Sequence, residues 1–580
     1  MNKRPLIVTC IALVLLTIFA EAKTVNVKLL PSGIDATPYI VEAIKKCKAS
    51  KATKLVFEKG TYHFTPEFAE EKYLFTSNND EGLKRIVFNL TGMKNFEVDG
   101  QGSAFIFDGF VTPFLCDKST NIRIGNLSID YKRTFHSEGT IVGAYTDSLD
   151  IQFSKDYPYI VQNNKLTFTG DKIIGKDNAG EPKRVIYPFW HLLEFDINKR
   201  EPHPFAGDYL NVQNMVVKEL SPGIVRIFYP RLKGNVGNIM VFNASDRINS
   251  AITITDSENI YVNNVDILHA GGMGVVGQRS RNIYLDNFNV IAPKGRMLSL
   301  VADATHFIGC GGEISLKNCK FESMMDDATN IHGIYVKIIE LISPNEALVK
   351  LIHYQQFGYD FLFAGTKVEI TEAESLIPYQ ENKVKKSVRI NKEYTRVTFE
   401  QPISPKVKVG DVVASTQEYP DVHIKNCTLQ KNRARGFLLG SRGKIVVEDC
   451  YFHTHCAAIN LEGDGRFWFE QSGVRDLTIR NNVFDNCNYS FMLGLGVIQV
   501  NSGIEESKRA ESRYNRNILI ENNKFRVFNP CILSMYSVDN LTFRNNTIEK
   551  NNDYVLSDWM KNVDLKPFMI TNSSNIKIEE

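Results

Sequence analysis

The chain has 580 residues, of which 43% are apolar and 23% charged, and its formal net charge is +2. The length predicts more than one domain or one elongated repeat domain, and the composition is that of a globular protein. A net charge so close to zero argues against a surface built for nucleic acid or for a strongly anionic polymer.

Residues 1–22 predict a secretory signal peptide. The positive pair Lys3-Arg4 is followed by an apolar run from Leu6 to Phe19 and by Ala20-Glu21-Ala22, which fits a small-x-small cleavage site. We therefore expect secretion to the periplasm or the medium, with no membrane insertion after cleavage. A membrane anchor is the alternative, but the run is short for a membrane span.

Nine cysteines remain after the predicted cleavage. An odd number without CxxC spacing describes neither a disulfide framework nor a zinc site. Free cysteines are usually small core residues, so we predict no metal centre from them.

The predicted N-terminal cap comes next. Residues 33–47 (GIDATPYIVEAIKKC) show helical apolar spacing behind Thr37-Pro38, and residues 54–64 (KLVFEKGTYHF) alternate as strand, turn and strand. A helix of this kind would shield the open end of a stacked β-structure.

One pattern then recurs, with alternating apolar residues, usually an asparagine at the sixth position, and a further apolar residue at the ninth. The copies are NIRIGNLSI from 121, NIYVNNVDI from 259, NIYLDNFNV from 282, EISLKNCKF from 313, DVHIKNCTL from 421, KIVVEDCYF from 444, DLTIRNNVF from 476, NILIENNKF from 517 and NLTFRNNTI from 540. A period in the low twenties with strand-like alternation is typical of a solenoid whose coils share one core. We predict an all-β protein built on a right-handed parallel β-helix.

The sixth-position asparagines predict a ladder along one bend, because asparagine tolerates left-handed backbone and bonds its own turn. They are Asn126, Asn264, Asn287, Asn318, Asn426, Asn481, Asn522 and Asn545. At the next position, Cys319, Cys427 and Cys450 predict an internal stack of thiols.

Two stretches lack the repeat, and they divide the chain. We assign residues 23–131 to the cap and first coils, 251–333 to middle coils and 419–580 to C-terminal coils. Residues 132–250 and 334–418 are rich in strand signals and too long to be loops, so we predict two inserted small β-domains, barrels or sandwiches. The second begins directly after ATNIHG and should border any site formed there.

The same triplet, Asp-Ala-Thr, occurs in LVADATHFIG at Asp303 and in ESMMDDATNIHG at Asp327, with Asp326 beside it. Coils in a β-helix lie about 4.8 Å apart, so we expect Asp303 and Asp327 to stack with Asp326 displaced by one residue. Crowding keeps one carboxyl protonated and another ionised, which suits the acid–base chemistry of glycoside hydrolysis. The alternative is that these aspartates only cap bends.

Polar neighbours on the same segments, His306, Asn330 and His332, are predicted to contact a substrate. No lysine or arginine lies within the two strands to serve as a lyase base, and no dense acidic cluster suggests calcium. Further on, NLEGDGRFWFEQSGVRD places charged residues around aromatics, which suits a sugar platform. From it we predict four more substrate-binding residues, Glu462, Asp464, Trp468 and Glu470. A structural loop is the alternative.

Two resemblances emerge. DATPYIVEAI with LVFEKGTYHF resembles the opening of pectate-lyase-like β-helix proteins. VADATHF, SMMDDATNIHG and EGDGRFWFEQSGVRD resemble glycoside hydrolase family 110, secreted bacterial exo-α-galactosidases, over the whole chain after the signal. This resemblance implies an inverting hydrolase that needs no metal or other cofactor and removes terminal α-1,3-linked galactose from glycans, including the blood group B determinant.

Carried across, the family's catalytic aspartates fall on Asp303, Asp326 and Asp327. We assign Asp303 as the acid and the pair as holder and base of the attacking water, although spacing alone leaves the roles exchangeable. Inversion predicts carboxyl groups roughly 6.5–9.5 Å apart.

Three alternatives stay open at this point. A polygalacturonase-like hydrolase also pairs one aspartate with a doublet, but it expects Gly-His-Gly and Arg-x-Lys on later coils. Here His332 follows the doublet by five residues, and Arg442-Gly443-Lys444 is a poor substitute. A non-catalytic carbohydrate-binding β-helix would survive loss of Asp303, and a polysaccharide lyase would depend on calcium and form unsaturated products.

Overall fold

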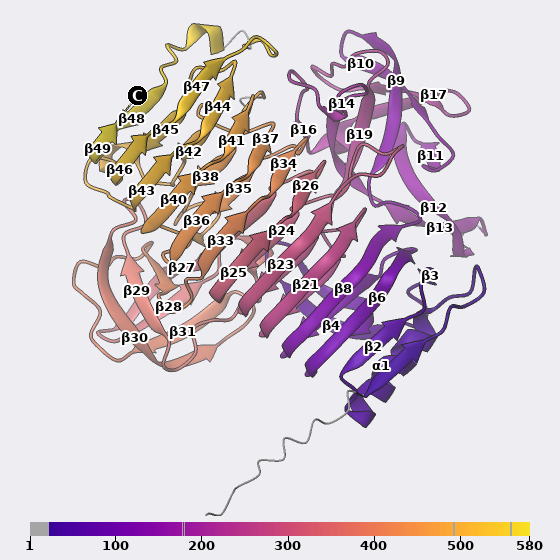
Figure 1. Cartoon of the computed structure of the whole chain (residues 1–580), viewed down its shortest axis with the longest axis horizontal. Coiled ribbons are helices and arrows are strands. Elements are labelled where there is room, and N and C mark those ends of the chain that lie inside the picture. Colours follow the sequence, from indigo (N-terminus) through magenta and orange to yellow (C-terminus); the bar gives the residue numbers. More distant parts are fainter. Residues whose placement is uncertain (1–22, 177, 179, 491–492, 557–559, 580) are drawn as a thin grey trace, which may run out of the picture.

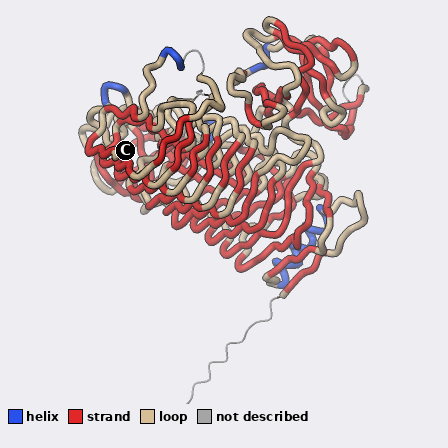
Figure 2. Tube along the Cα trace, turned by 45° about the horizontal axis from the view of Figure 1, so that its top comes forward, coloured by secondary structure: helices blue, strands red, loops and turns tan. Residues whose placement is uncertain are grey.

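The computed structural model describes residues 23–176, 178, 180–490, 493–556 and 560–579, so the predicted signal peptide lies outside the described residues. A long stack of β-coils crosses the molecule, and two further bodies project from it (Figure 1). The prediction of an all-β parallel β-helix is confirmed (Figure 2).

One long parallel sheet forms the outer wall of the stack. Neighbouring coils pair in strict sequence along it, for example Ile260 with Ile283 and Val262 with Leu285. Its main strands are β2 (Lys54–Phe57), β6 (Lys94–Phe107), β8 (Thr120–Tyr131), β21 (Glu258–Ile267), β23 (Arg281–Val290), β25 (Gly311–Lys317), β33 (Asp421–Lys425), β36 (Lys444–Glu448), β40 (Asp476–Arg480), β43 (Asn515–Glu521), β46 (Val538–Arg544) and β49 (Ser574–Ile578). Their buried apolar residues face one continuous core.

A second parallel sheet closes the other side of this core and carries the candidate site. Its strands are short and follow one another up the stack. They are β5 (Asp80–Asn89), β7 (Thr112–Asp117), β20 (Ile252–Thr255), β22 (Val275–Gln278), β24 (Thr305–Ile308), β27 (Thr329–Ser343), β35 (Phe437–Leu439), β38 (Ile459–Leu461), β42 (Ile498–Val500), β45 (Leu533–Tyr536) and β48 (Phe568–Thr571).

The predicted repeat register is the observed one. Where copies begin 23 residues apart, the same positions pair, as in Val422 with Ile445. The pairing also spans the gaps in the repeat, because β8 pairs β21 and β25 pairs β33. Each inserted body therefore leaves the stack after one coil and returns at the next.

The asparagine ladder is confirmed. All eight sixth-position asparagines have positive φ, between 50° and 57°. Asn264 donates its Nδ2–H to Oδ1 of Asn126 at 3.1 Å, and Asn287 donates to Asn264 at 2.9 Å. The predicted thiol stack is present as well, with the Cys427 amide donating to Sγ of Cys450 at 3.4 Å. The nine described cysteines are all free and buried.

The predicted helical cap is α1 (Thr37–Ser50), which has Pro38 in its first turn and is followed by Lys51 in the left-handed conformation. Its buried residues, including Ile40 and Ile44, join the core of the β-helix. The strand–turn–strand prediction that follows is confirmed as β2 and β3 (Thr61–Phe64).

The first inserted body, domain I, has two antiparallel sheets around one apolar core. The larger contains β15 (Glu201–Pro202), β14 (Phe189–Asp196), β19 (Ile239–Ala244), β9 (Ser137–Tyr145), β10 (Ser148–Phe153), β18 (Ile224–Phe228) and β17 (Val216–Ser221), with β16 (Tyr209–Leu210) beside β14. The smaller contains β11 (Tyr159–Gln162), β12 (Lys165–Lys176) and β13 (Pro182–Tyr187). All of these strands lie within the predicted insertion 132–250.

The second inserted body, domain II, is a closed antiparallel barrel. Its strands pair in the cycle β27, β28 (Glu346–Lys350), β31 (Tyr394–Phe399), β30 (Pro378–Arg389), β29 (Lys367–Thr371), β32 (Val412–Ser415) and back to β27. Strand β27 belongs to both bodies: residues 329–332 pair with coil strands, and Tyr335 onward pairs within the barrel. The coil that bears the aspartate doublet thus runs directly into the barrel wall.

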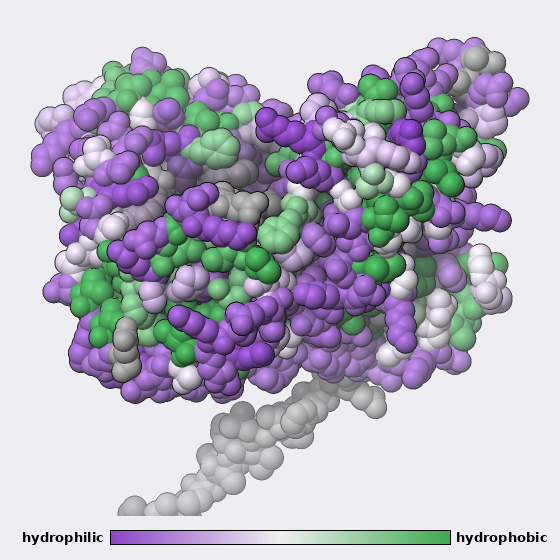
Figure 3. Space-filling model, turned by 90° about the horizontal axis from the view of Figure 1, so that it is seen from above, coloured by the Kyte–Doolittle hydropathy of each residue, from purple (hydrophilic) through white to green (hydrophobic). Residues whose placement is uncertain are grey.

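Domain I is anchored to the stack near the second Asp-Ala-Thr segment. Leu193, Phe195 and Val241 of the domain form one buried cluster with Leu298 and Met325 of the coils. A polar contact joins Glu201 to His453 of a C-terminal coil at 3.0 Å. The face seen in Figure 3 is hollowed between the lobe of domain I and the lobe of the C-terminal coils.

Candidate active site

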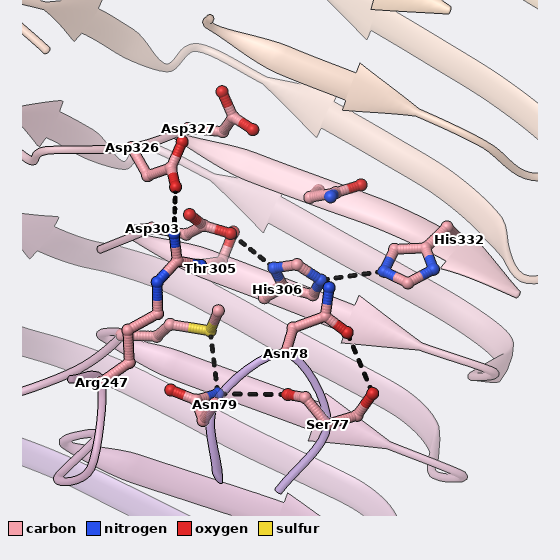
Figure 4. Close-up of polar contacts among 12 residues, drawn as sticks. Ser77, Asn78, Asn79, Arg247, Asp303, Thr305, His306, Asp326, Asp327 and His332 are labelled. Carbon is pink, nitrogen blue, oxygen red and sulfur yellow. Dashed lines mark hydrogen bonds and ion pairs between the residues drawn. The ribbon is translucent and has the colours of Figure 1, made fainter. Parts of the chain in front are cut away.

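The two Asp-Ala-Thr segments stack as predicted. Thr305 pairs with Thr329 in parallel register, so Asp303 and Asp327 occupy equivalent places on neighbouring coils, just before β24 and β27. The Ala304 amide donates to the carbonyl of Asp327 at 2.9 Å, which locks the coils together at this point. Asp326 precedes Asp327 by one residue and approaches the same spot (Figure 4).

The three carboxyl groups form one cluster. An oxygen of each lies within 4.8 Å of an oxygen of the others. The side chains of Asp303 and Asp327 are 2% and 3% exposed, whereas that of Asp326 is 16% exposed. The separation of roughly 6.5–9.5 Å expected between the whole carboxyl groups of an inverting pair stays a prediction.

Arginines from outside the two strands neutralise the doublet. Arg247, from the segment between β19 and β20, donates an Nη2–H to Oδ2 of Asp326. Arg435, just before β35, binds Asp327 with both arms: Nε to Oδ1 at 3.0 Å and Nη2 to Oδ2 at 2.8 Å. Its backbone amide also donates to Oδ1 at 2.9 Å. Within the described chain, Asp303 is the member of the cluster without an arginine hydrogen bond.

A second ionic pair joins Asp208 of domain I to Arg433 of the C-terminal coils. Arg433 donates Nε–H to Oδ1 of Asp208 at 3.1 Å, and His191 contacts the same carboxylate. Burial raises the pKa of Asp208, but His191 and Arg433 outweigh it and hold that pKa well below its usual range. Domain I thus contributes Asp208 and His191, the charged wall, near Asp326.

These contacts separate the pKa values of the doublet. Burial raises the pKa of Asp326, but the charges of Arg247, Arg433 and Arg435 outweigh it and lower that pKa overall. Burial, together with the charges of Asp326 and Asp303, raises the pKa of Asp327 to about 7 in spite of Arg435. A pair of this kind supplies an ionised group and a group that titrates near neutrality, as acid–base catalysis requires.

The predicted histidines lie in line with Asp303 (Figure 4). His306 Nδ1 contacts Oδ2 of Asp303, and His306 Nε2 lies 2.9 Å from His332 Nε2. His332 Nδ1 in turn lies 2.7 Å from the Gly333 carbonyl oxygen, and its Nε2 lies 3.5 Å from Oε1 of Glu470. The other oxygen of Asp303, Oδ1, is buried without a hydrogen-bond partner among the described residues.

Glu470 closes the site from a later coil. It starts β39 (Glu470–Gln471), which runs antiparallel to β27 at Gly333 and Ile334. Asn78, from the turn between β4 (Glu70–Thr76) and β5, donates to its Oε1 at 3.1 Å, and Asn330 donates to its Oε2 at 3.5 Å. The structure therefore brings His332, Asn330 and Glu470 together, and their contact with a substrate stays a prediction.

The remaining predicted residues lie further out. Glu462 Oε2 is 3.8 Å from Nη1 of Arg435, and burial raises its pKa to about 7 against the charge of Arg435. Asp464 accepts the backbone N–H groups of Arg466, Phe467 and Trp468, so both of its oxygens shape its own loop. Substrate contact by Glu462 and Asp464 stays a prediction.

Trp468 is the exposed aromatic of this loop. It is 41% exposed, and its ring centre lies 4.9 Å from that of His353 and 5.0 Å from that of Phe467. Its carbonyl accepts a hydrogen bond from Gln356 of domain II at 3.0 Å. An accessible aromatic edge thus lies two residues from Glu470, and its contact with a sugar stays a prediction.

Sequence reasoning missed the cations and the wall from domain I. Arg433 and Arg435 stand in KNRARGFLLG, directly before β35, a strand of the sheet that carries the aspartates. Two arginines two residues apart at the start of such a strand could have indicated cations beside the aspartates. Arg247 and Asp208 carry no such signal, because a coil boundary and a domain insertion separate them from the aspartates. A search for basic residues within the two strands alone overlooks cations supplied by other segments.

Among the described residues, two clusters could each offer a metal ion three ligand atoms within 4.8 Å of one another. One is His306, His332 and Glu470, and the other is the three aspartates. Hydrogen bonds join the two histidines, and Arg247 and Arg435 bind the doublet. These atoms already have partners, so we assign no metal, and the expectation that none is needed stays a prediction.

Comparison with known proteins covers nearly the whole chain. A family described as GLAA-B beta-barrel domain I matches residues 137–240, GLAA-B beta-barrel domain II matches 346–413, and a right handed beta helix region matches 412–580. Alpha-1,3-galactosidase A of Shewanella woodyi is 36% identical, covering 90% of this chain and 84% of that protein. Alpha-1,3-galactosidase B of Bacteroides thetaiotaomicron is 31% identical, covering 94% and 89%.

Solved structures show lower similarity. The family 28 exopolygalacturonase of Yersinia enterocolitica aligns with 97% of this chain and 79% of its own, at 11% identity and a TM-score of 0.41.

Proposed function

The chain belongs to the α-1,3-galactosidase family, glycoside hydrolase family 110, and on that premise we propose that it hydrolyses terminal α-1,3-linked D-galactose from oligosaccharides and glycoconjugates. The observation that carries the proposal is the aspartate cluster. Two of its members are bound by arginines, and the third, Asp303, has an oxygen without a partner among the described residues. The polygalacturonase-like and non-catalytic alternatives have no comparable support.

The proposed chemistry divides the cluster into two parts. Asp303 gives a proton to the glycosidic oxygen while the bond from galactose to that oxygen breaks. The pair Asp326/Asp327 holds a water molecule and takes its proton as the water attacks the anomeric carbon. The pKa of Asp327, raised to about 7, suits a base that must accept a proton near neutral pH.

Inversion at the anomeric carbon is part of the proposal, and two observations bear on it differently. Both oxygens of Asp327 are engaged by Arg435, which disfavours a covalent bond to galactose and favours a role in activating water. The oxygens that lie within 4.8 Å of one another would also allow retention, with the more exposed Asp326 as nucleophile. The configuration of the first product distinguishes the two.

We propose that the substrates include the branched blood group B trisaccharide and also linear α-1,3-galactosides. The charge of Arg433, which binds Asp208 of domain I, acts on Asp326, and Trp468 lies two residues from Glu470. Both would contact the sugar next to galactose. Export through the signal peptide at residues 1–22 is also proposed. No helix in the described part of the chain is long and apolar enough to cross a membrane.

The test is proton NMR of the purified mature protein mixed separately with an α-1,3-galactobioside and with the blood group B trisaccharide. We expect β-galactose as the first product from both. Release of α-galactose first would refute inversion, and no galactose from either would refute the function. Turnover of one substrate alone would settle the branch requirement.

Asp303→Asn should lower the rate by about 10³-fold or more, because an amide cannot donate an acidic proton. Asp266→Asn is the matched control. Asp266 lies on the outer sheet, in β21, and accepts a hydrogen bond from Asn289 at 2.9 Å that an amide oxygen can also accept. A full rate for Asp303→Asn would remove this residue from the mechanism.

A further inference from the structure

The loop that carries Trp468 is held in a fixed shape. Asp464 accepts the backbone N–H groups of Phe467 and Trp468. The next residue, Phe469, is buried at a φ of 59°, which a bulky side chain adopts only where its surroundings hold it there. Its carbonyl accepts the backbone amide of Tyr335 in β27 at 2.8 Å. The loop therefore keeps Phe469 inside the protein and leaves Phe467 and Trp468 at the surface.

Domain II brings two further rings against this loop. Between β28 and β29, His353 precedes a short 3-10 helix, η2 (Tyr354–Gln356). The ring centre of His353 lies 5.0 Å from that of Tyr354 and 4.9 Å from that of Trp468. Gln356 is buried and donates its Nε2–H to the Trp468 carbonyl at 3.0 Å, which ties the helix to the loop. The rings of Tyr354, His353, Trp468 and Phe467 thus form one cluster, the aromatic patch.

The aromatic patch is open to solvent and uncharged. Tyr354 is 69% exposed and Phe467 is 68% exposed. Burial lowers the pKa of His353, and Arg247 lowers it further although Glu470 opposes this, so the ring is neutral near pH 7. A single exposed ring needs no explanation, but a contiguous cluster held in place by buried polar contacts is typical of a binding surface.

The patch is continuous with the aspartate site through Asn78. The backbone amide of Asn78 donates to the carbonyl of Gln355 in η2 at 3.1 Å, and its Nδ2–H donates to Oε1 of Glu470 at 3.1 Å. Glu470 closes the site, follows Trp468 by two residues, and its charge acts on the ring of His353. A ligand that leaves the aspartates on this side therefore meets Trp468 and His353 first.

We propose that the aromatic patch binds the neutral sugars that follow the terminal galactose, so that the enzyme prefers extended glycans to disaccharides. This inference rests on the proposed function. Trp468 and His353 pack against the sugar next to galactose, and Tyr354, on the far side of His353, packs against the second sugar. A pyranose presents apolar C–H groups to an aromatic ring while its hydroxyl groups stay in water, which suits an exposed and uncharged patch.

Three substrates of increasing length test this proposal. α-D-Galactosyl fluoride fills the galactose site alone, an α-1,3-galactobioside adds one sugar, and a trisaccharide adds a second, β-linked N-acetylglucosamine at the reducing end. The wild-type protein should cleave the trisaccharide with a kcat/KM about tenfold above that of the galactobioside, mainly through a lower KM.

Variants at the two parts of the patch should act on different substrates. Tyr354→Ala should lower kcat/KM on the trisaccharide by about tenfold more than on the galactobioside, because only the second sugar contacts this ring. Trp468→Ala should lower kcat/KM on both of these substrates by about tenfold more than on the fluoride. Tyr354→Phe keeps the ring and should keep the preference for the trisaccharide.

The matched control is Tyr39→Ala. Tyr39 is 55% exposed and lies in α1, in the N-terminal cap, so its loss should leave the rates on all three substrates unchanged. Thermal unfolding of each variant shows whether it is folded.

The remaining outcomes each contradict the proposal in a recognisable way. Equal kcat/KM values of the wild-type protein on the galactobioside and the trisaccharide, or equal losses on both in Tyr354→Ala, would overturn the inference and leave the galactosidase intact. A dimer in sedimentation that Tyr354→Ala dissociates, with no change in substrate preference, would assign the patch to a second copy of the chain. Cleavage of none of the three substrates by the wild-type protein would refute the proposed function, and the inference with it.

Discussion

The β-helix stacks similar side chains in two places, with opposite consequences. At the outer bend, Asn126, Asn264 and Asn287 lie one above another, and each amide donates to the oxygen of the one before it. On the second sheet, the same stacking brings Asp303 against Asp327. Amides complement one another when stacked, whereas carboxylates repel, so the second column needs cations.

The two columns also differ in where their partners come from. The asparagine ladder is satisfied within the repeat itself, by the coil directly before. The aspartates depend on Arg247, Arg435 and His306, and the two arginines come from segments outside the two Asp-Ala-Thr strands. Side chains that are hydrogen-bonded within the repeat stabilise the fold. Side chains that need charged partners from other segments have shifted pKa values, which catalysis can use.

The largest expected effect comes from removing Arg435, the cation that binds Asp327. Arg435→Met leaves Asp327 buried without its partner, and we expect it to lower the free energy of unfolding by about 3–5 kcal/mol and to abolish activity. Urea unfolding and galactobioside turnover measure both. The double variant Arg435→Met/Asp327→Asn should recover stability but not activity. No recovery would mean that Arg435 stabilises the protein through other contacts.

The second prediction uses pH. If Asp327 is the base, it must be ionised, so protonation below its raised pKa of about 7 should reduce kcat/KM about tenfold per pH unit. Glu462 also has a pKa raised to about 7 by burial, so Glu462→Gln tests the assignment. The acidic limb should persist in that variant. Its disappearance would assign the limb to Glu462.

A smaller effect is expected in the ladder. Asn287→Ala removes a hydrogen bond of 2.9 Å to Asn264 and places alanine at φ 50°. Together these changes should cost about 1–2 kcal/mol, measured by urea unfolding, with activity unchanged. Asn287→Gly, which relieves the backbone strain, should cost less. An equal cost for both variants would show that backbone strain contributes little at this bend.

The smallest effect is expected where the ladder already contains a carboxylate. Asn318 donates to Oδ1 of Asp286 at 2.7 Å, and Asp286→Asn keeps an acceptor there while removing the charge. Stability, measured by urea unfolding, should change by no more than about 0.5 kcal/mol. A loss above about 1 kcal/mol would show that the ladder depends on charge and is not self-complementary.

Much of the fold could be predicted from the sequence because the repeat is local. The spacing of 23 residues, the left-handed asparagines and the apolar alternation each depend on neighbours within one coil, so they specify the stack, its register and the ladder. The same register places Asp303 beside Asp327 without the help of any distant segment. The strand-rich gaps in the repeat likewise indicate two inserted β-bodies.

Only the tertiary structure decided how the site is charged and closed. Asp208 and Arg433 are 225 residues apart, and Asn78 and Glu470 are 392 apart, so no local pattern connects them. Oxygens of the three carboxylates lie within 4.8 Å of one another, and Arg247 and Arg435 offset the repulsion between them. A repeat determines which residues stack, but the electrostatics of a stacked column depend on every segment that packs against it.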